Sequence, residues 1–212
     1  MATRPAYLIE NGKVIRKDYD FTWISGLSAS QKQKCALSLH EAIRSTDASA
    51  NVLEVSTKSN IPLGIKMSAF NLKLDGYPLE NIFQSSKVFA FGGPYPDLLH
   101  MHPREAKHNE RLRTSGDLTG FRYQDIDFPL EPKTLFYDYI YIKAICETLS
   151  AEEIQQIRDY SHFTDIEFNP AKSINTQAKT AAEIRLMLDL FGKITEMTPD
   201  EFLQFHKQNV LA

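Results

Sequence analysis

Three side chains with the chemistry to cleave a glycosidic bond are spaced along one predicted helix. The sequence predicts this helix to begin at Pro78, because proline favours a first helical position, and to run to about Phe91. At about 100° per residue, Glu80, Gln84 and Lys87 then lie within about 60° of one another. A carboxylate can stabilise the oxocarbenium-like sugar of such a reaction. An amine whose pKa is lowered by desolvation can attack the anomeric carbon and form a Schiff base.

An apolar stripe lies beside this polar stripe on the same predicted helix. It consists of Leu79, Ile82, Phe83 and Ala90. Because an apolar stripe packs against the core, the three polar side chains are expected at the edge of the buried region. On spacing alone, a glutamate and a lysine on a helix flank are more often a solvated face than a site. The pattern leaves both interpretations open.

Positive charge gathers on a second predicted helix, from Arg104 to Arg113, which begins after Pro103. Arg104, Lys107 and Arg111 have the spacing of residues that face one way. Such a face suits a pyrophosphate or a DNA phosphate. A solvated helix balanced by the glutamates between these residues is an equally good interpretation.

Helices and short strands must position these groups. The turn pairs Asn11-Gly12 and Asp75-Gly76 predict a hairpin and a tight turn, and Ser150 and Thr198 begin capping boxes. No linker rich in Pro, Gly or Ser divides the chain. The sequence therefore predicts an α+β fold, a mainly helical single domain with a small sheet. The predicted helices cover residues 28–45, 78–91, 104–113, 134–149 and 177–191, with one more after each capping box, and the predicted strands lie within 6–10, 14–16, 52–56 and 65–74.

The composition is that of an ordinary globular protein, with 212 residues of which 42% are hydrophobic and 24% charged. No apolar run is long enough to span a membrane, and the first residues lack the apolar core of a signal peptide. We therefore expect a cytoplasmic protein with no membrane partner. The formal net charge of −3 is opposite in sign to that of proteins that coat DNA nonspecifically. A nucleic-acid partner is thus expected to contact a local patch.

Four segments in order resemble motifs of the NADAR family. Residues 80–87 (ENIFQSSK) are similar to the central pattern E-x-x-F-Q-x-x-K of the family. Residues 67–71 resemble its F-S-N-F strand, and residues 103–107 resemble its S-P-x-E-A segment. Thr164-Asp165 and residues 173–178 lie where the family has an aspartate and the asparagine that opens its last shared helix. The resemblance covers roughly residues 65 to 190.

Three further segments, at residues 91–98, 129–138 and 165–170, are similar to NADAR antitoxins encoded beside DarT-type toxins. Those toxins attach ADP-ribose to guanine in DNA, and the antitoxins remove it. Ala69 and residues 166–170 depart from the members of the riboflavin pathway. The resemblance implies the NADAR fold in one domain, 1–212, with an N-terminal extension of hairpin and helix (1–64), a family core (65–192) and a C-terminal helix (193–212).

Carried onto this sequence, the resemblance implies a role for each site residue. Lys87 is the nucleophile that forms an imine with the distal ribose. Glu80 is the acid–base group or the carboxylate opposite the developing positive charge, and Asp165 orients Lys87 or delivers water. The implied substrate contacts are Ser68, Phe70, Asn71, Gln84, Arg104 and Asn175.

The implied activity is that of a hydrolase, which cleaves the N-glycosidic bond between ADP-ribose and guanine in DNA, with RNA left open. ADP-ribose is the product, water is the co-substrate, and a cognate DarT-like toxin is a partner. We expect no cofactor and no metal, because the spacing of His100, His102 and His108 is irregular. Two alternatives remain: a non-catalytic binder of ADP-ribosylated DNA or of the toxin, and an N-glycosidase for riboside phosphates of the riboflavin pathway.

Overall fold

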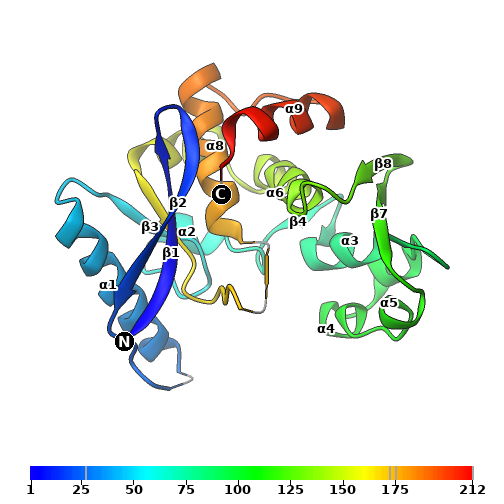
Figure 1. Cartoon of the computed structure of the whole chain (residues 1–212), viewed down its shortest axis with the longest axis horizontal. Helices are drawn as coiled ribbons and strands as arrows, with labels where there is room; N and C mark the ends of the chain where they lie inside the picture. Colours follow the sequence, from blue (N-terminus) through cyan, green and yellow to red (C-terminus); the bar gives the residue numbers. More distant parts are fainter. Residues whose placement is uncertain (27, 172, 175, 212) are drawn as a thin grey trace. The chain divides into compact units, whose positions relative to one another are not determined.

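The computed structural model describes residues 1–26, 28–171, 173, 174 and 176–211 (Figure 1). Its chain divides into two compact units. The first unit consists of Met1–Ser68 and Leu149–Ala212, and the second of Ala69–Thr148. Both contain helices and short strands, with more helix than strand, so the predicted α+β class is confirmed. The predicted internal boundaries at residues 64 and 192 stay predictions.

A four-stranded sheet with the order β2-β1-β9-β3 organises the first unit. Its strands are β1 (Ala2–Glu10), β2 (Lys13–Phe21), β3 (Val52–Glu54) and β9 (His162–Thr164). β1 pairs antiparallel with both β2 and β9, and β3 pairs parallel with β9. The hairpin turn at Asn11-Gly12 has φ angles of 52° and 73°, which match the twist of the flanking strands. The predicted hairpin is confirmed, with longer strands than predicted.

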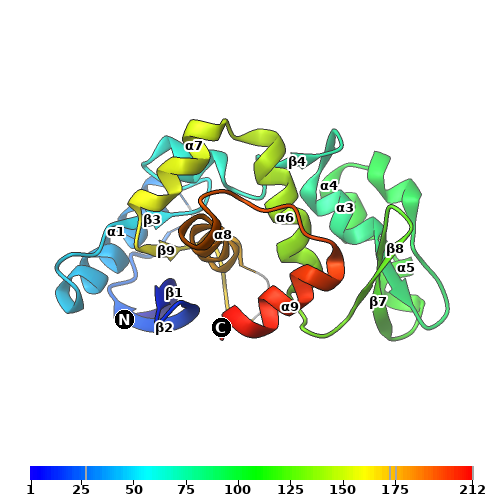
Figure 2. The same ribbon diagram turned by 90° about the horizontal axis from the view of Figure 1, so that it is seen from above.

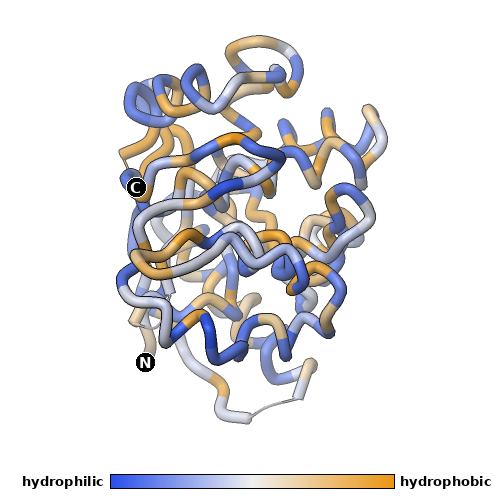
Figure 3. Tube along the Cα trace, turned by 90° about the vertical axis from the view of Figure 1, so that its right-hand side faces the viewer, coloured by the Kyte–Doolittle hydropathy of each residue, from blue (hydrophilic) through white to orange (hydrophobic). Residues whose placement is uncertain are grey.

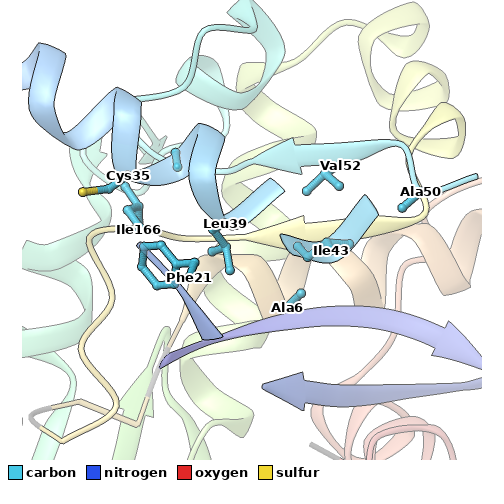
Figure 4. Close-up of a cluster of buried hydrophobic side chains, with 9 residues drawn as sticks. Ala6, Phe21, Cys35, Leu39, Ile43, Ala50, Val52 and Ile166 are labelled. Atoms are coloured by element: carbon cyan, nitrogen blue, oxygen red, sulfur yellow. The ribbon is translucent and has the colours of Figure 1, made fainter. Parts of the chain in front are cut away.

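The helix α1 (Ala29–Thr46) covers one face of this sheet. Its side chains Cys35, Leu39 and Ile43 are fully buried and pack in one cluster with Ala6 and Val52 of the strands (Figure 4). Burying apolar surface in this way stabilises the fold by roughly 25 cal/mol per Å². The α1 contact therefore fixes the hairpin strands beside the short strands β9 and β3.

The helix α8 (Gln177–Phe191) contacts β1 and β9 on the side of the sheet away from α1 (Figures 1 and 2). Tyr7 of β1, Phe163 of β9 and Leu53 of β3 lie side by side in the register of the sheet and are buried. Because neighbouring side chains of a strand point to opposite faces, both faces of the sheet are covered. β9 consequently lies in the interior of the unit.

Capping residues define the ends of the helices in this unit, and the predicted capping boxes at Ser150 and Thr198 are confirmed. Ser28, Ser150 and Thr198 each accept a backbone hydrogen bond from the residue three positions on, within complete capping boxes. Gly192 ends α8 with a left-handed φ of 73°. The remaining helical segments are α2 (Pro62–Lys66), α7 (Ala151–Gln156), the 3₁₀ turn η2 (Ile157–Asp159) and α9 (Pro199–Asn209).

The predicted strand at residues 65–74 is mostly wrong. Pro62 begins α2, which continues to Lys66, and turns follow it up to the two-residue strand β4 (Lys73–Leu74). Proline at a first helical position has the fixed φ that a helix requires. The local start signal therefore outweighs the alternation of apolar and polar residues. β4 pairs with β5 (Tyr77–Pro78) across the predicted turn, which is confirmed.

The second unit is built around α3 (Leu79–Ser85) and a three-stranded antiparallel sheet. Its strands are β6 (Lys87–Phe89), β7 (Leu118–Tyr123) and β8 (Ile126–Pro129). Its other elements are the 3₁₀ turn η1 (Pro96–His100), α4 (Pro103–Lys107), α5 (Arg111–Thr114) and α6 (Leu135–Thr148). The sequence predicts α6 but not β7 and β8, because Gln124-Asp125, which turns between these two strands, is not a strong hairpin signal.

Aromatic rings form the core between α3, α6 and the sheet of the second unit. The rings of Phe121 and Phe136 are stacked with their centroids 4.6 Å apart. Phe83 lies 5.4 Å from Phe121, and Phe128 lies 5.0 Å from Phe136. Such pairs are worth about 0.5–1.5 kcal/mol each beyond the area they bury. This cluster holds α3 against β7.

No helix of the described residues is long and apolar enough to cross a membrane. Hydrophobic and hydrophilic stretches instead alternate in short segments along the trace (Figure 3).

Replacing Gly64 in α2 by alanine should destabilise the first unit. The added Cβ would lie 2.1 Å from the backbone oxygen of Glu54, so α2 or β3 must shift. We expect Gly64→Ala to lower the free energy of unfolding by about 2–3 kcal/mol. Gly12→Ala is the control: its Cβ meets nothing within 4 Å, and only the φ of +73° is unfavourable, at a cost of roughly 1 kcal/mol. Chemical denaturation of the two variants measures both. Equal losses would contradict the close packing of α2 on β3.

Candidate functional site

Lys87 lies on a strand and not on the helix that carries Glu80 and Gln84. α3 ends at Ser85, and Lys87 is the first residue of β6, opposite Phe121 of β7. The predicted helix to Phe91 is therefore wrong in its second half. Serines are weak helix formers, and Val88 and Phe89 favour strands, so pairing with β7 prevails over the helical spacing.

The structure nevertheless brings the three predicted side chains together. We call Glu80, Phe83, Gln84, Lys87 and Lys107 the Lys87 cluster. Gln84 donates from Nε2 to Oε1 of Glu80 over 2.8 Å. The Nζ atom of Lys107, from α4, lies 3.6 Å from the same carboxylate oxygen. Three elements, α3, β6 and α4, thus contribute to one small polar site.

The amine of Lys87 is shielded by an aromatic ring. Its Nζ lies 5.0 Å from the centroid of the Phe83 ring, within the range of a cation–π contact. Burial lowers the pKa of Lys87, which the carboxylate of Glu80 opposes and the positive charge of Lys107 reinforces. A lowered pKa raises the fraction of neutral, nucleophilic amine near neutral pH.

Gln84 offers an acceptor that the described part of the chain leaves unused. The residue is 5% exposed, and its Oε1 atom is buried without a hydrogen-bond partner among the described residues. An unsatisfied buried acceptor costs about 1–3 kcal/mol. A hydroxyl of a bound sugar would remove that cost. Gln84 therefore binds the Glu80 carboxylate through Nε2, while its Oε1 has no hydrogen-bond partner among the described residues.

The predicted basic helix is divided into two helices. α4 ends at Lys107 and α5 begins at Arg111, so Arg104, Lys107 and Arg111 do not form one stripe. The guanidinium of Arg111 binds the carboxylate of Asp97 and lies 4.4 Å from the ring centroid of Tyr95. Lys107 alone of the three joins the Lys87 cluster, and the sequence analysis missed this role because it requires the fold of α4 against α3.

The other predicted substrate contacts fall into different surroundings. Phe70 is 80% exposed, and Asn71 and Arg104 are also exposed in the second unit. Ser68 belongs to the first unit and is fully buried, with a hydroxyl that has no hydrogen-bond partner among the described residues. Asn175 lies outside the described residues. The roles of these residues in substrate binding stay predictions.

Asp165 follows β9 in the first unit and forms part of a buried carboxyl pair. Its Oδ1 accepts the backbone N–H of Glu167 (3.0 Å) and of Phe168 (3.1 Å). Burial, together with the neighbouring carboxyl of Glu54, raises the pKa of Asp165 well above its ordinary value. Burial raises the pKa of Glu54 as well.

Glu54 is held by a network that the sequence analysis did not detect. It accepts hydrogen bonds from the Ser56 hydroxyl (2.6 Å), the Ile166 N–H (2.8 Å) and the Thr164 hydroxyl (2.7 Å). The hydroxyl of Thr164 also contacts Nε2 of His40 over 3.0 Å. Burial lowers the pKa of His40 to about 4. The network keeps a carboxyl and a neutral imidazole next to Asp165.

The side chains of the E-x-x-F-Q-x-x-K pattern gather around one carboxylate and one desolvated amine. The family model described as DarT1-associated NADAR antitoxin matches residues 2–212, nearly the whole chain. The chain belongs to this family and is an antitoxin of a DarT1 system. No curated protein matches it.

The pKa of Lys87 should respond in opposite directions to its two charged neighbours. Glu80→Gln should lower the pKa further, because it removes the negative charge that favours the ammonium form. Lys107→Gln should raise it, because it removes a like charge. The ¹³C resonances of reductively methylated lysines, followed against pH by NMR, measure both shifts. A Lys87 signal that titrates at or above the ordinary lysine value in the unaltered protein would refute its desolvation.

The buried Asp165 should make the first unit less stable as pH rises. A raised pKa in the folded state means that folding retains a proton which the unfolded chain loses above about pH 4. The free energy of unfolding therefore falls from about pH 4 upward. Urea unfolding at pH 5 and pH 8 measures the free energy of unfolding of Asp165→Asn and of the unaltered protein. The difference between them should shift in favour of the variant by at least about 1 kcal/mol from pH 5 to pH 8. Glu41→Gln, on the exposed side of α1, is the control. The same difference at both pH values would disprove the raised pKa.

Proposed function

We propose that this antitoxin is an N-glycosidase that removes ADP-ribose from guanine in DNA. The observation that carries the proposal is the desolvated amine of Lys87 within the field of the Glu80 carboxylate. A surface lysine would be protonated and unreactive at neutral pH, whereas this lysine has the environment of Schiff-base lysines.

The proposed reaction has two steps. The ammonium of Lys87 first gives a proton to the carboxylate of Glu80. The resulting neutral amine attacks the anomeric carbon of the distal ribose while the bond to the guanine amino group breaks, and Glu80 passes the same proton to that leaving nitrogen. The ribose ring opens to give a protonated imine on Lys87. Water then adds to the imine carbon, the carbon–nitrogen bond to Lys87 breaks, and ADP-ribose leaves. The sum is ADP-ribosylguanine plus water giving guanine and ADP-ribose.

Neighbouring groups support this chemistry. The carboxylate of Glu80 is held in place by Gln84 and faces the positive charge that develops on the sugar. In the proposed complex a ribose hydroxyl donates to Oε1 of Gln84, which has no hydrogen-bond partner among the described residues. The side chain of Lys107 is 59% exposed and carries positive charge to the edge of the cluster, where it suits a pyrophosphate. The cluster therefore offers a nucleophile, an acid–base group and an anion contact.

The family resemblance supplies the rest of the proposal. It assigns the delivery of water or the orientation of Lys87 to Asp165. It also assigns substrate contacts to Ser68, Phe70, Asn71 and Arg104, and it places the activity in the cytoplasm, where a DarT1 toxin reaches DNA. No metal or cofactor takes part in the proposed steps.

The proposal is tested with DNA that a DarT1 toxin has ADP-ribosylated on guanine. The unaltered protein should release free ADP-ribose, and borohydride added during the reaction should trap the sugar on Lys87. Lys87→Ala should lose both the adduct and activity, on the order of 1,000-fold or more. Lys133→Ala removes an exposed lysine of the same unit and should keep full activity.

Each alternative has its own result in the same experiments. An adduct that persists in Lys87→Ala would exclude Lys87 as the nucleophile. Lys87→Ala that still rescues cells from the toxin would indicate a binding protein and not an enzyme. Cleavage of riboside phosphates, with no cleavage of ADP-ribosylated DNA, would assign the chain to small-molecule metabolism. Faster cleavage of ADP-ribosylated RNA than of DNA would make RNA the proposed substrate.

A further inference from the structure

The second unit contains a cavity of about 280 Å³ that lies apart from the Lys87 cluster. It opens between α3, the β4–β5 hairpin, η1 and the β7–β8 turn. Its lining includes Asp75, Tyr77, Ile82, Pro96, Tyr123 and Asp125. None of the five residues of the Lys87 cluster lines it. The proposed hydrolysis therefore leaves this cavity without a function.

α3 separates the cavity from the cluster. Glu80 and Gln84 are one turn apart on one side of the helix, while Ile82 and Ser85 point to the other side. Asn81 fixes the helix to the chain around η1 by donating from Nδ2 to the backbone oxygens of Leu98 (2.8 Å) and Met101 (2.7 Å). One short, anchored helix thus has a different site on each side.

The walls of the cavity suit a flat aromatic ligand. Tyr77 and Tyr123 contribute aromatic rings, and Pro94, Pro96 and Leu99 contribute rigid or apolar surface. The ring of Tyr77 is held edge-on by His100, with the ring centroids 5.4 Å apart. Stacking on aromatic side chains is worth about 1–3 kcal/mol per nucleobase. With about 280 Å³, the cavity is at the lower end of the size range of ligand pockets, which starts at about 300 Å³. This volume suits one base and not a whole dinucleotide.

The polar end of the cavity accepts hydrogen bonds. Oδ2 of Asp75 accepts from the hydroxyl of Tyr123 and from Nε2 of Gln124. Burial, together with this contact to Asp75, raises the pKa of Tyr123, so the hydroxyl stays a donor. Oδ1 of Asp75 accepts no hydrogen bond from the part of the chain that the structure describes. The carboxylate of Asp125 lies at the same end. A ligand must therefore present N–H groups to this end.

We propose that the cavity binds an unstacked purine base, whose exocyclic amino group donates to Asp75 while its ring lies between Tyr77 and Tyr123. Guanine and adenine both carry such an amino group. Thymine presents carbonyl oxygens on either side of its one N–H, and these oxygens would face the carboxylates. The base has two possible sources, a guanine of the DNA strand and the adenine of ADP-ribose. This choice of sources rests on the proposed function.

Isothermal titration of the protein with dGMP, ADP-ribose and dTMP tests this proposal. Asp75→Asn keeps the shape of the side chain and tolerates the left-handed φ of 52° at this turn, but it removes the charged acceptor. We expect the affinity for at least one purine ligand to fall about tenfold or more in Asp75→Asn. Asp117→Asn is the matched control, since it removes an exposed carboxylate of the same unit that does not line the cavity.

The outcomes separate the two sources and the two proposals. A loss confined to dGMP identifies guanine of the DNA strand as the ligand, and a loss confined to ADP-ribose identifies its adenine. Equal binding of purines by Asp75→Asn and the unaltered protein, or binding of dTMP as tight as that of dGMP, would overturn the assignment. Tyr77→Leu, which keeps the site apolar but removes the ring, should weaken the same ligand.

Binding is measured without turnover, so it is independent of the proposed hydrolysis. Loss of purine binding in Asp75→Asn together with an unaltered protein that cleaves no ADP-ribosylated DNA would refute the glycosidase and keep the purine site. Full hydrolysis with unchanged binding in Asp75→Asn would refute the purine site alone. In a protein that does both, Asp75→Asn should raise KM for modified DNA and leave kcat unchanged, because Asp75 lies away from the reacting bond.

Discussion

The chemistry of this protein depends on where α3 ends. Ser85 is the last residue of the helix, and one residue later Lys87 begins β6, paired with β7. This change of direction places the amine over the ring of Phe83, one turn beyond Glu80 along α3. A strand that leaves the helix end directly lets the aromatic core desolvate the amine.

Burying the charged form of Lys87 costs free energy, and the carboxylate of Glu80 offsets part of this cost. The Glu80 carboxylate attracts the ammonium form, while Lys107 competes for the same carboxylate oxygen at 3.6 Å. Because the Lys107 side chain is largely exposed, solvent screens its charge. A bound pyrophosphate would draw Lys107 away from Glu80 and leave that carboxylate to the developing sugar cation. Under the proposed function, this ion pair links binding of the anion to activation of the site.

The sequence predicts well wherever a local signal decides the structure. Ser28, Ser150 and Thr198 begin helices, and Asn11-Gly12 turns a hairpin, because caps and turns depend on a few adjacent residues. The family pattern likewise identifies Glu80, Gln84 and Lys87 as neighbours. Helical spacing is not what makes them neighbours, because α3 ends at Ser85 and Lys87 lies on β6. Its partners on β7 are more than 30 residues away in the chain, and no local pattern encodes such pairing.

The remaining site features require the tertiary fold. Lys107 reaches Glu80 only because α4 packs on α3, and the Tyr77–Tyr123 cavity joins segments that are remote in sequence. Both depend on the same seven-residue helix, α3, whose Asn81 is tied to the chain around η1. A helix this short has little stability of its own, so packing on the aromatic core must hold it. The side of α3 that faces the cavity and the side that carries Glu80 and Gln84 therefore depend on the same packing contacts.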